Sequence, residues 1–240
     1  MSDDALSQDA ILRGRLTLWQ PRAGYRFSVD PLLLIDFVTP PFGRVIDLGC
    51  GVGVIGLGLL SRDAAATATL VELQPRLAAL ARRNVDDNGA GPRARVVEGD
   101  VAAGLSLSGA GFDVAVCNPP YRTLEEGPAS PDPEAAIAQH ELKLTLPAMA
   151  SEMRRLLAPG GRAAVVFPAA RLPSLLAALD AAGLKPLRLR CVHPRAGEPA
   201  NRVLVEAHKG ARGPLVIEPP LLVRDAAGYT AEAARILGDG

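Results

Sequence analysis

Two short runs of the sequence hold residues whose types and spacing could do chemistry. The first is DLGCGVG, residues 47–53, at the end of an apolar stretch. Glycines in such a turn let the backbone approach a ligand closely, and the start of a following helix favours polar or negative groups. The carboxylate of Asp47 would repel a pyrophosphate, but it could hold a cationic amino group. A tight turn without a ligand is the plain structural alternative.

The second run is Asn118-Pro119-Pro120-Tyr121, which follows the apolar stretch FDVAVC. Two prolines fix the backbone and donate no N–H, so their carbonyl groups face outward. The side-chain oxygen of Asn118 and a proline carbonyl can accept both hydrogens of one planar amino group, which directs the nitrogen lone pair toward an electrophile. Tyr121 offers a ring for stacking. The pattern indicates transfer to an exocyclic base amine or a glutamine amide, by positioning and electrostatics rather than a covalent nucleophile.

Two further acids follow predicted strands. Glu72 lies about 20 residues after the first run, and Gly51, Gly53 and Gly56 also fit a dinucleotide-binding pattern with it. Asp100 follows the next strand, where it is either a ligand acceptor or the N-cap of a helix over residues 101–107. A nucleotide-binding oxidoreductase, or a module that binds a cofactor without catalysis, therefore stays open.

The elements that position these runs alternate along the chain. Strands are predicted over residues 44–48, 68–73, 94–98, 113–117, 162–167, 185–192 and 202–208, and helices over 54–62, 75–88, 141–157 and 171–182. Short strands separated by helices predict an α/β fold, with a mostly parallel sheet and helices on both faces. Only the loop HPRAGEPAN joins the last two strands, so they are expected to pair antiparallel at an edge.

The 240 residues suit one domain with additions at both ends. Residues 1–40 are expected to form an N-terminal extension, an extended segment and then a short helix that contains the apolar run 32–38. Asp30 is the predicted N-cap of that helix, and Pro31 its first position. Residues 41–210 hold the alternating elements, and residues 211–240 are expected to be a C-terminal tail. The acidic, Pro-rich segment 122–139 is expected to be a loop.

Charge and composition exclude several classes of protein. The 26 cationic and 26 anionic residues cancel, so binding to nucleic acid would need local patches. No apolar stretch approaches the roughly 20 residues of a membrane span, and the acidic start is no secretory signal, so we expect a cytoplasmic protein. The three cysteines, Cys50, Cys117 and Cys191, lie far apart and form no CxxC pair, and the histidines lack the spacing of metal ligands, so we expect no disulfide framework and no metal. His140 and His208 are interpreted as structural.

Several of these runs resemble known families. DLGCGVG resembles the S-adenosylmethionine loop of class I methyltransferases, and FDVAVCNPPY resembles the N6-adenine, N4-cytosine and glutamine methyltransferases as a group. LWQPRAGYRFSVDPLLL and VHPRAGEPANRVLVEAHKG resemble the bacterial family that methylates N6 of an adenine in the anticodon loop of a valine tRNA. The resemblance covers residues from about 16 to 210. The chain departs from it in having few lysines and an Ala-rich segment after residue 219.

The resemblance implies a Rossmann-like class I methyltransferase fold, whose seven-stranded sheet has the order 3-2-1-4-5-7-6 and one antiparallel strand. It also implies S-adenosylmethionine as the cofactor. The residues expected at the cofactor are Asp47, Gly49, Cys50 and Gly51 at the methionine part, Glu72 and Leu73 at the ribose, Asp100 and Val101 at the adenine, and Asn118. The residues expected to be catalytic are Asn118, Pro119, Pro120 and Tyr121.

The activity implied by the resemblance is N6-methylation of an adenine in tRNA, with S-adenosylhomocysteine as the second product. N5-methylation of a protein glutamine and methylation of an rRNA base amine remain alternatives. Arg22, Arg26, Phe27 and Arg195 are expected to bind RNA, within arginine clusters at residues 13–26 and 188–202. An ordinary solvated face is the alternative for these arginines. The protein is expected to be a monomer or a weak homodimer.

Overall fold

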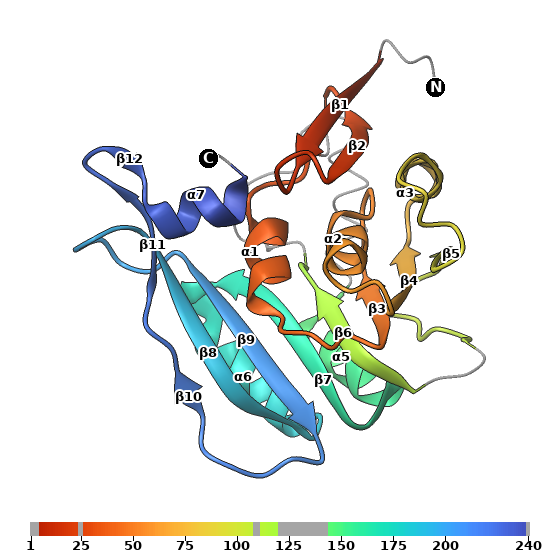
Figure 1. Ribbon diagram of the computed structural model, residues 1–240. Helices are drawn as coiled ribbons and strands as arrows, with labels where there is room; N and C mark the ends of the chain where they lie inside the picture. Colours follow the sequence, from red (N-terminus) through yellow and green to blue (C-terminus); the bar gives the residue numbers. More distant parts are fainter. Residues whose placement is uncertain (1–4, 24–25, 108–110, 120–143, 239–240) are drawn as a thin grey trace, which may run out of the picture.

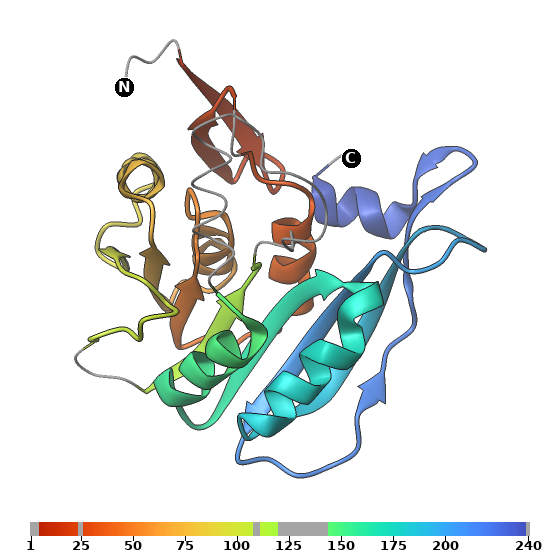
Figure 2. The same ribbon diagram turned by 180° about the vertical axis from the view of Figure 1, so that it is seen from behind.

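The sheet has helices on both faces, as the alternation of short strands and helices predicts. The computed structural model describes residues 5–23, 26–107, 111–119 and 144–238. Figure 1 shows α1 and α2 in front of the sheet, and Figure 2 shows α5 and α6 on the opposite face. The first elements are β1 (Leu6–Ile11), β2 (Leu16–Pro21) and α1 (Asp30–Phe37).

The central part of the chain alternates between strands and helices. Its elements are β3 (Arg44–Leu48), α2 (Val54–Arg62), β4 (Thr67–Glu72), α3 (Pro75–Asp87), β5 (Ala94–Glu98) and β6 (Phe112–Cys117). The second half comprises α5 (Leu146–Leu156), β7 (Leu157–Pro168), η2 (Ala169–Arg171), α6 (Leu172–Ala181), β8 (Leu184–Arg195) and β9 (Arg202–Lys209). The last elements are β10 (Val216–Ile217), β11 (Leu221–Asp225), β12 (Gly228–Tyr229) and α7 (Ala231–Leu237).

The large sheet has the strand order β12-β11-β8-β9-β7-β6-β3-β4-β5, and β10 also pairs with β8. Counted from β3, the seven strands from β5 to β8 follow the order 3-2-1-4-5-7-6. The predicted α/β class and strand order are therefore confirmed. Within these seven strands β9 is the antiparallel one, since it runs against both β7 and β8.

Four details differ from the sequence-based predictions. The strands β8 and β9 pair antiparallel as predicted, but β8 is not at an edge because β10 and β11 pair with its other side. Residues expected to be a C-terminal tail instead add β10, β11, β12 and α7 to this sheet and its face. The hairpin of β1 and β2 forms a sheet of its own. No helix follows Asp100, where residues 101–103 form a turn.

The start of α1 also differs from its prediction. Val29 is the N-cap and Asp30 is the first helical residue, with no side-chain cap. The carboxylate of Asp30 accepts instead from Nε of Arg202 at 2.9 Å. This ion pair ties the start of α1 to the start of β9.

Alternating residues of each strand fill two cores. Val114 and Val116 of β6 face the core under α1, α2 and α3, while Ala115 and Cys117 face the core under α5 and α6. This alternation is the period-two pattern of a strand buried on both faces. The sheet therefore separates two clusters of buried side chains, one on each of its faces.

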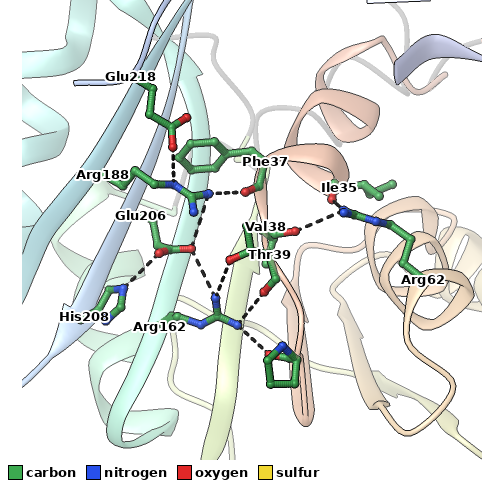
Figure 3. A network of polar contacts seen from close by, with 11 residues as sticks. Ile35, Phe37, Val38, Thr39, Arg62, Arg162, Arg188, Glu206, His208 and Glu218 are labelled. Atoms are coloured by element: carbon green, nitrogen blue, oxygen red, sulfur yellow. Dashed lines mark hydrogen bonds and ion pairs between the residues drawn. The ribbon is translucent and has the colours of Figure 1, made fainter. Parts of the chain in front are cut away.

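A buried carboxylate joins the second half of the sheet. Glu206 of β9 is 4% exposed and lies between Arg162 of β7, at 3.7 Å, and Arg188 of β8, at 3.8 Å. His208 approaches the same carboxylate at 3.0 Å. Figure 3 shows these side chains converging on Glu206. The pairing of a buried charge with several partners is what makes its burial tolerable.

The two arginines extend this network to more distant segments. Arg162 donates to the carbonyl oxygens of Thr39 and Pro41, at 3.0 and 2.8 Å, just past the end of α1. Arg188 lies over the ring of Phe37, 4.0 Å from its centroid, and pairs with Glu218 at 3.2 Å. The network therefore connects three strands, the end of α1 and the segment between β10 and β11 (Figure 3).

Candidate functional site

The two chemical runs leave the sheet side by side. In the parallel pair of β3 and β6, Leu48 lies opposite Cys117, so the glycine run and Asn118 follow from neighbouring strand ends. On the other side of β3, Leu48 lies opposite Val71 of β4. After β3 the chain first forms β4 on one side of β3 and later forms β6 on the other side. Ligands of open α/β sheets bind at such a switch point, outside the carboxyl ends of the strands.

The glycine run forms a tight turn between β3 and α2. Gly49, Gly51 and Gly53 have φ of 72°, 57° and 92°, a region that glycine enters without steric cost. The N–H groups of Gly49 and Cys50 both donate to the carbonyl oxygen of Val71 at 2.9 Å, which fixes the turn against β4. Gly53 then serves as the N-cap of α2.

Asp47 lies beneath this turn and is fully buried. Its Oδ2 accepts from the N–H of Gly56 at 2.9 Å. Its Oδ1 is buried without a hydrogen-bond partner among the described residues. The pKa of Asp47 is raised to about 7, chiefly by burial; the N–H of Gly56 works against this rise and the nearby charge of Glu72 adds to it. An orphaned buried oxygen of this kind fits a donor from outside the chain, such as an ammonium group.

Glu72 ends β4 and faces the same turn. Its two oxygens accept from the N–H groups of Gly51 and Gln74, each at 2.8 Å. Burial raises the pKa of Glu72, while the two N–H donors lower it. Each carboxylate oxygen still has a second lone pair that a hydroxyl group can use. Leu73, the next residue, is 39% exposed and offers an apolar surface beside it.

Asp100 and Val101 lie two and three residues beyond β5. The Oδ1 of Asp100 accepts from the N–H of Ala102 at 2.8 Å, so its side chain closes a turn rather than starting a helix. The side chain of Val101 is buried against the core below α5. This pair borders the same edge of the sheet as Glu72, because Glu72 lies opposite Glu98 in β5.

Asn118 and Pro119 follow β6 directly. Asn118 is half-buried and Pro119 is buried, so the beginning of the second run is packed rather than free in solvent. Pro120 and Tyr121 lie outside the described residues, as does His140. The described half of the run therefore starts beside the glycine turn, where the register of β3 and β6 places it.

Residues 29–171 match the family described as the methyltransferase small domain. The chain belongs to this methyltransferase family. A tRNA1(Val) (adenine(37)-N6)-methyltransferase of Aeromonas hydrophila is 33% identical over 168 residues, which cover 70% of this chain and 69% of that protein. A protein of the same name from Parabacteroides distasonis is 27% identical over 193 residues, or 80% of each chain.

A solved structure of a predicted O-methyltransferase from Agrobacterium tumefaciens is also similar to this chain. Its TM-score is 0.69 at 26% identity, and the match covers 86% of this chain and 94% of the other. Together with the family match, this likeness confirms the predicted class I methyltransferase fold. The alternative of a nucleotide-binding oxidoreductase is set aside by the family that the chain belongs to.

The residues predicted on the RNA side of this methyltransferase lie in two places. Arg26 donates to the Oγ of Ser7 at 2.8 Å, and Phe27 packs partly against the core. Arg22 and Arg195 are exposed. Arg22, Arg26 and Phe27 flank the open end of the hairpin, while Arg195 ends β8. The predicted RNA-binding residues therefore lie in two separate segments, one just after β2 and one at the end of β8.

Most of the second predicted arginine cluster makes contacts within the chain. Arg190 binds both carboxylate oxygens of Glu232 at 2.9 Å, and Arg202 binds Asp30. Arg188 belongs to the network of Glu206. Three arginines of this cluster therefore hold elements of the methyltransferase together, and the sequence alone gave no sign of these partners.

One residue that shapes the site was missed by the sequence analysis. Asn84 of α3 is fully buried, and its Nδ2 donates to the carbonyl oxygen of Val52 in the glycine run at 2.9 Å. It also binds the backbone of Trp19 in β2, through the N–H at 2.7 Å and the carbonyl at 3.0 Å. A polar residue on the apolar face of a predicted helix was the available signal.

Within the described part of the chain, no helix has the length and apolar character needed to cross a bilayer. Across the same residues, His, Cys, Asp and Glu side chains form no group of three or more placed to hold a metal ion.

Proposed function

We propose that the protein transfers a methyl group from S-adenosylmethionine to N6 of an adenine in tRNA, in the anticodon loop of a valine tRNA. The observation that carries this proposal is the pairing of Leu48 with Cys117, which starts Asn118-Pro119 beside the glycine turn. The similarity to two proteins named tRNA1(Val) (adenine(37)-N6)-methyltransferase supports the substrate. A tRNA substrate would place the protein in the cytoplasm.

The residues present fit the cofactor. The orphaned Oδ1 of Asp47 suits the cationic amino group of its methionine part, with Gly49, Cys50 and Gly51 alongside. The free lone pairs of Glu72 suit the ribose hydroxyls, and the exposed Leu73 suits an apolar ring face. Asp100 and Val101 would receive the adenine amine and ring. When bound, S-adenosylmethionine supplies an electrophilic methyl group on a positively charged sulfur.

Asn118 and a proline carbonyl would act on the adenine amine. By accepting hydrogen bonds from its two N–H groups, they would direct the nitrogen lone pair toward the methyl carbon. The N–C bond would form as the bond from that carbon to the cofactor sulfur breaks, and the methylated amine would lose one proton to solvent. The contribution is positional, because the reactants are held in one geometry and no covalent nucleophile of the chain takes part. Pro120 and Tyr121 complete the run, with Tyr121 offering its ring to the base. Arg22, Arg26, Phe27 and Arg195 would bind the RNA around the base.

The direct test uses labelled S-adenosylmethionine with unmodified tRNA or with a cell protein extract. We expect label in tRNA, recovered as N6-methyladenine by nucleoside mass spectrometry, and loss of this nucleoside from cells that lack the gene. Asn118→Ala should reduce kcat by at least about 100-fold and leave the Kd of S-adenosylmethionine within a few fold, because the lost acceptor serves the reacting amine.

Two results would contradict the proposal. Label found only in protein would favour glutamine methylation and leave the fold and the cofactor intact. A fully active Asn118→Ala enzyme would remove the proposed alignment of the lone pair, whichever substrate is methylated.

A further inference from the structure

A pocket of about 170 Å³ lies on the helical face that carries α1 and α2. It is bounded by the turn of the β1–β2 hairpin, by α1, by the end of α2 and by α7. Among the residues that the structure describes, its charged lining consists of four arginines and a single acid, and the other lining residues are apolar. These charged residues are Arg13, Arg15, Arg62, Arg235 and Asp36. The described lining residues therefore carry a formal charge of +3, four cations less one anion, in a protein whose total charge is zero.

Asp36, the acid among the described lining residues, already has a cationic partner. Arg235 of α7 binds both oxygens of Asp36, at 2.8 and 3.0 Å, in the fork geometry that an arginine and a carboxylate favour. Arg62 is directed instead at the end of α1, where it donates to the carbonyl oxygens of Ile35 and Val38 (Figure 3). Burial lowers the pKa of Arg62, Asp36 raises it, and the nearby Arg235 and Arg15 lower it. Like charges are thus held close together here.

The other two arginines come from the hairpin turn. The side chains of Arg13 and Arg15 are exposed, and neither has a hydrogen bond or ion pair with the described residues. Leu12 and Arg13 both have positive φ, 51° and 59°, which costs conformational energy in residues other than glycine. Leu12 gains packing against the core from this conformation. Arg13 gains no such packing, and the turn instead directs it to the pocket.

We propose that this pocket binds a phosphate group, and that the backbone of the RNA substrate supplies it. Guanidinium groups match the planar, multiple acceptors of phosphate, and they are less strongly hydrated than ammonium groups. The second half of the proposal rests on the proposed function. The position of α1 fits an RNA ligand, because α1 connects β9 with the pocket. Its first residue, Asp30, is bound to Arg202 at the start of β9. Asp36 lies roughly 9 Å further along the helix axis. Nucleotides flanking a base inserted at the strand ends would reach the pocket.

The test compares the double variant Arg13→Gln/Arg15→Gln with a control that loses the same charge elsewhere. The control is Lys185→Gln/Arg212→Gln, at the start of β8 and in the exposed segment before β10. We expect the first variant to bind unmodified tRNA about tenfold more weakly than wild type and to reduce the salt slope of binding by about 2, one for each lost phosphate contact. The control should match wild type.

A second arm uses inorganic phosphate without RNA, read out as the rise in Tm. Phosphate should stabilise wild type and the control, and should not stabilise Arg13→Gln/Arg15→Gln. All three proteins should bind S-adenosylmethionine equally, which shows that the hairpin variant is folded.

The possible failures are distinguishable. Equal tRNA affinity of the hairpin variant and the control would overturn the RNA half of the proposal, and a phosphate effect alone would then assign the pocket to a free anion. No difference in either arm would overturn the site altogether. A wild-type protein that does not methylate tRNA would refute the proposed function, while the phosphate arm would still decide whether the pocket binds phosphate.

Discussion

The carboxylate of Asp47 sits in an environment that opposes its charge. It is fully buried, and among the described residues only the N–H of Gly56 binds it. Its pKa rises to about 7 from the usual 3.8, so the folded protein holds this proton more tightly than the unfolded chain does. The contribution of Asp47 to stability is therefore greatest below pH 3.8 and is lost as pH rises through 7. A bound cation would relieve this cost.

We expect the affinity for S-adenosylmethionine to rise with pH between about 5 and 7, approaching tenfold per unit, because only the charged carboxylate attracts the amino group. Calorimetric titrations at several pH values, in buffers of different ionisation enthalpy, would measure both the affinity and the proton released. Asp47→Asn should bind weakly at every pH and should lose this slope. It should also be more stable than wild type above pH 7. An unchanged slope in Asp47→Asn would assign the titration to another group.

The hairpin of β1 and β2 is attached to α3 by two asparagines. The side-chain amide of each one hydrogen-bonds the backbone N–H and carbonyl of a residue in β2. Asn84 pairs its amide with the backbone of Trp19, and Asn88 pairs its amide with Thr17 at 3.0 and 2.8 Å. Four residues of helix rise about 6 Å and two residues of strand about 6.6 Å, so the two spacings match. The hairpin is thereby held by α3, and only Asn84 also reaches the glycine run, at Val52.

This arrangement provides a matched pair of variants. Asn84→Ala and Asn88→Ala each remove side-chain hydrogen bonds to β2, and each should lower the free energy of unfolding by about 1–3 kcal/mol. Only Asn84→Ala also frees the carbonyl oxygen of Val52. We therefore expect Asn84→Ala alone to weaken S-adenosylmethionine binding several-fold, and Asn88→Ala to leave it unchanged. Urea denaturation and calorimetry would measure the two quantities. Equal cofactor affinities would show that Asn84 holds the hairpin and not the glycine turn.

Local sequence signals account for the middle of the chain and fail at its ends. The strands from β3 to β9 could be predicted because apolar runs end at Gly or Pro, and Asp47, Glu72 and Asn118 stood out because each lies at or just after the end of such a run. β10 has two residues, and it forms only through its pairing with β8. The tertiary partners of Arg188, up to 151 residues away, carry no local pattern. The sequence did not predict the pocket lined by Arg13 either, because that pocket forms where four segments, distant along the chain, meet.

The network of Glu206 makes the distant parts of the chain depend on one another. Its carboxylate faces Arg162 and Arg188, whose side chains are only 18% and 19% exposed and which in turn hold the end of α1 and Glu218. Glu206→Gln would leave both arginines without their shared anion. We expect a loss of about 3–5 kcal/mol of stability, as for other broken buried ion pairs, and a Tm lower by about 10 °C.

The matched control is Glu98→Gln, which breaks the exposed pair with Arg82 and should change stability by no more than about 1 kcal/mol. Scanning calorimetry would measure both variants, and the Kd of S-adenosylmethionine should stay within twofold for Glu206→Gln, because Glu206 lies outside the cofactor site. A Tm for Glu206→Gln equal to that of Glu98→Gln would show that the two arginines find sufficient partners in the carbonyl groups at the end of α1, and that Glu206 adds nothing to the stability of the fold.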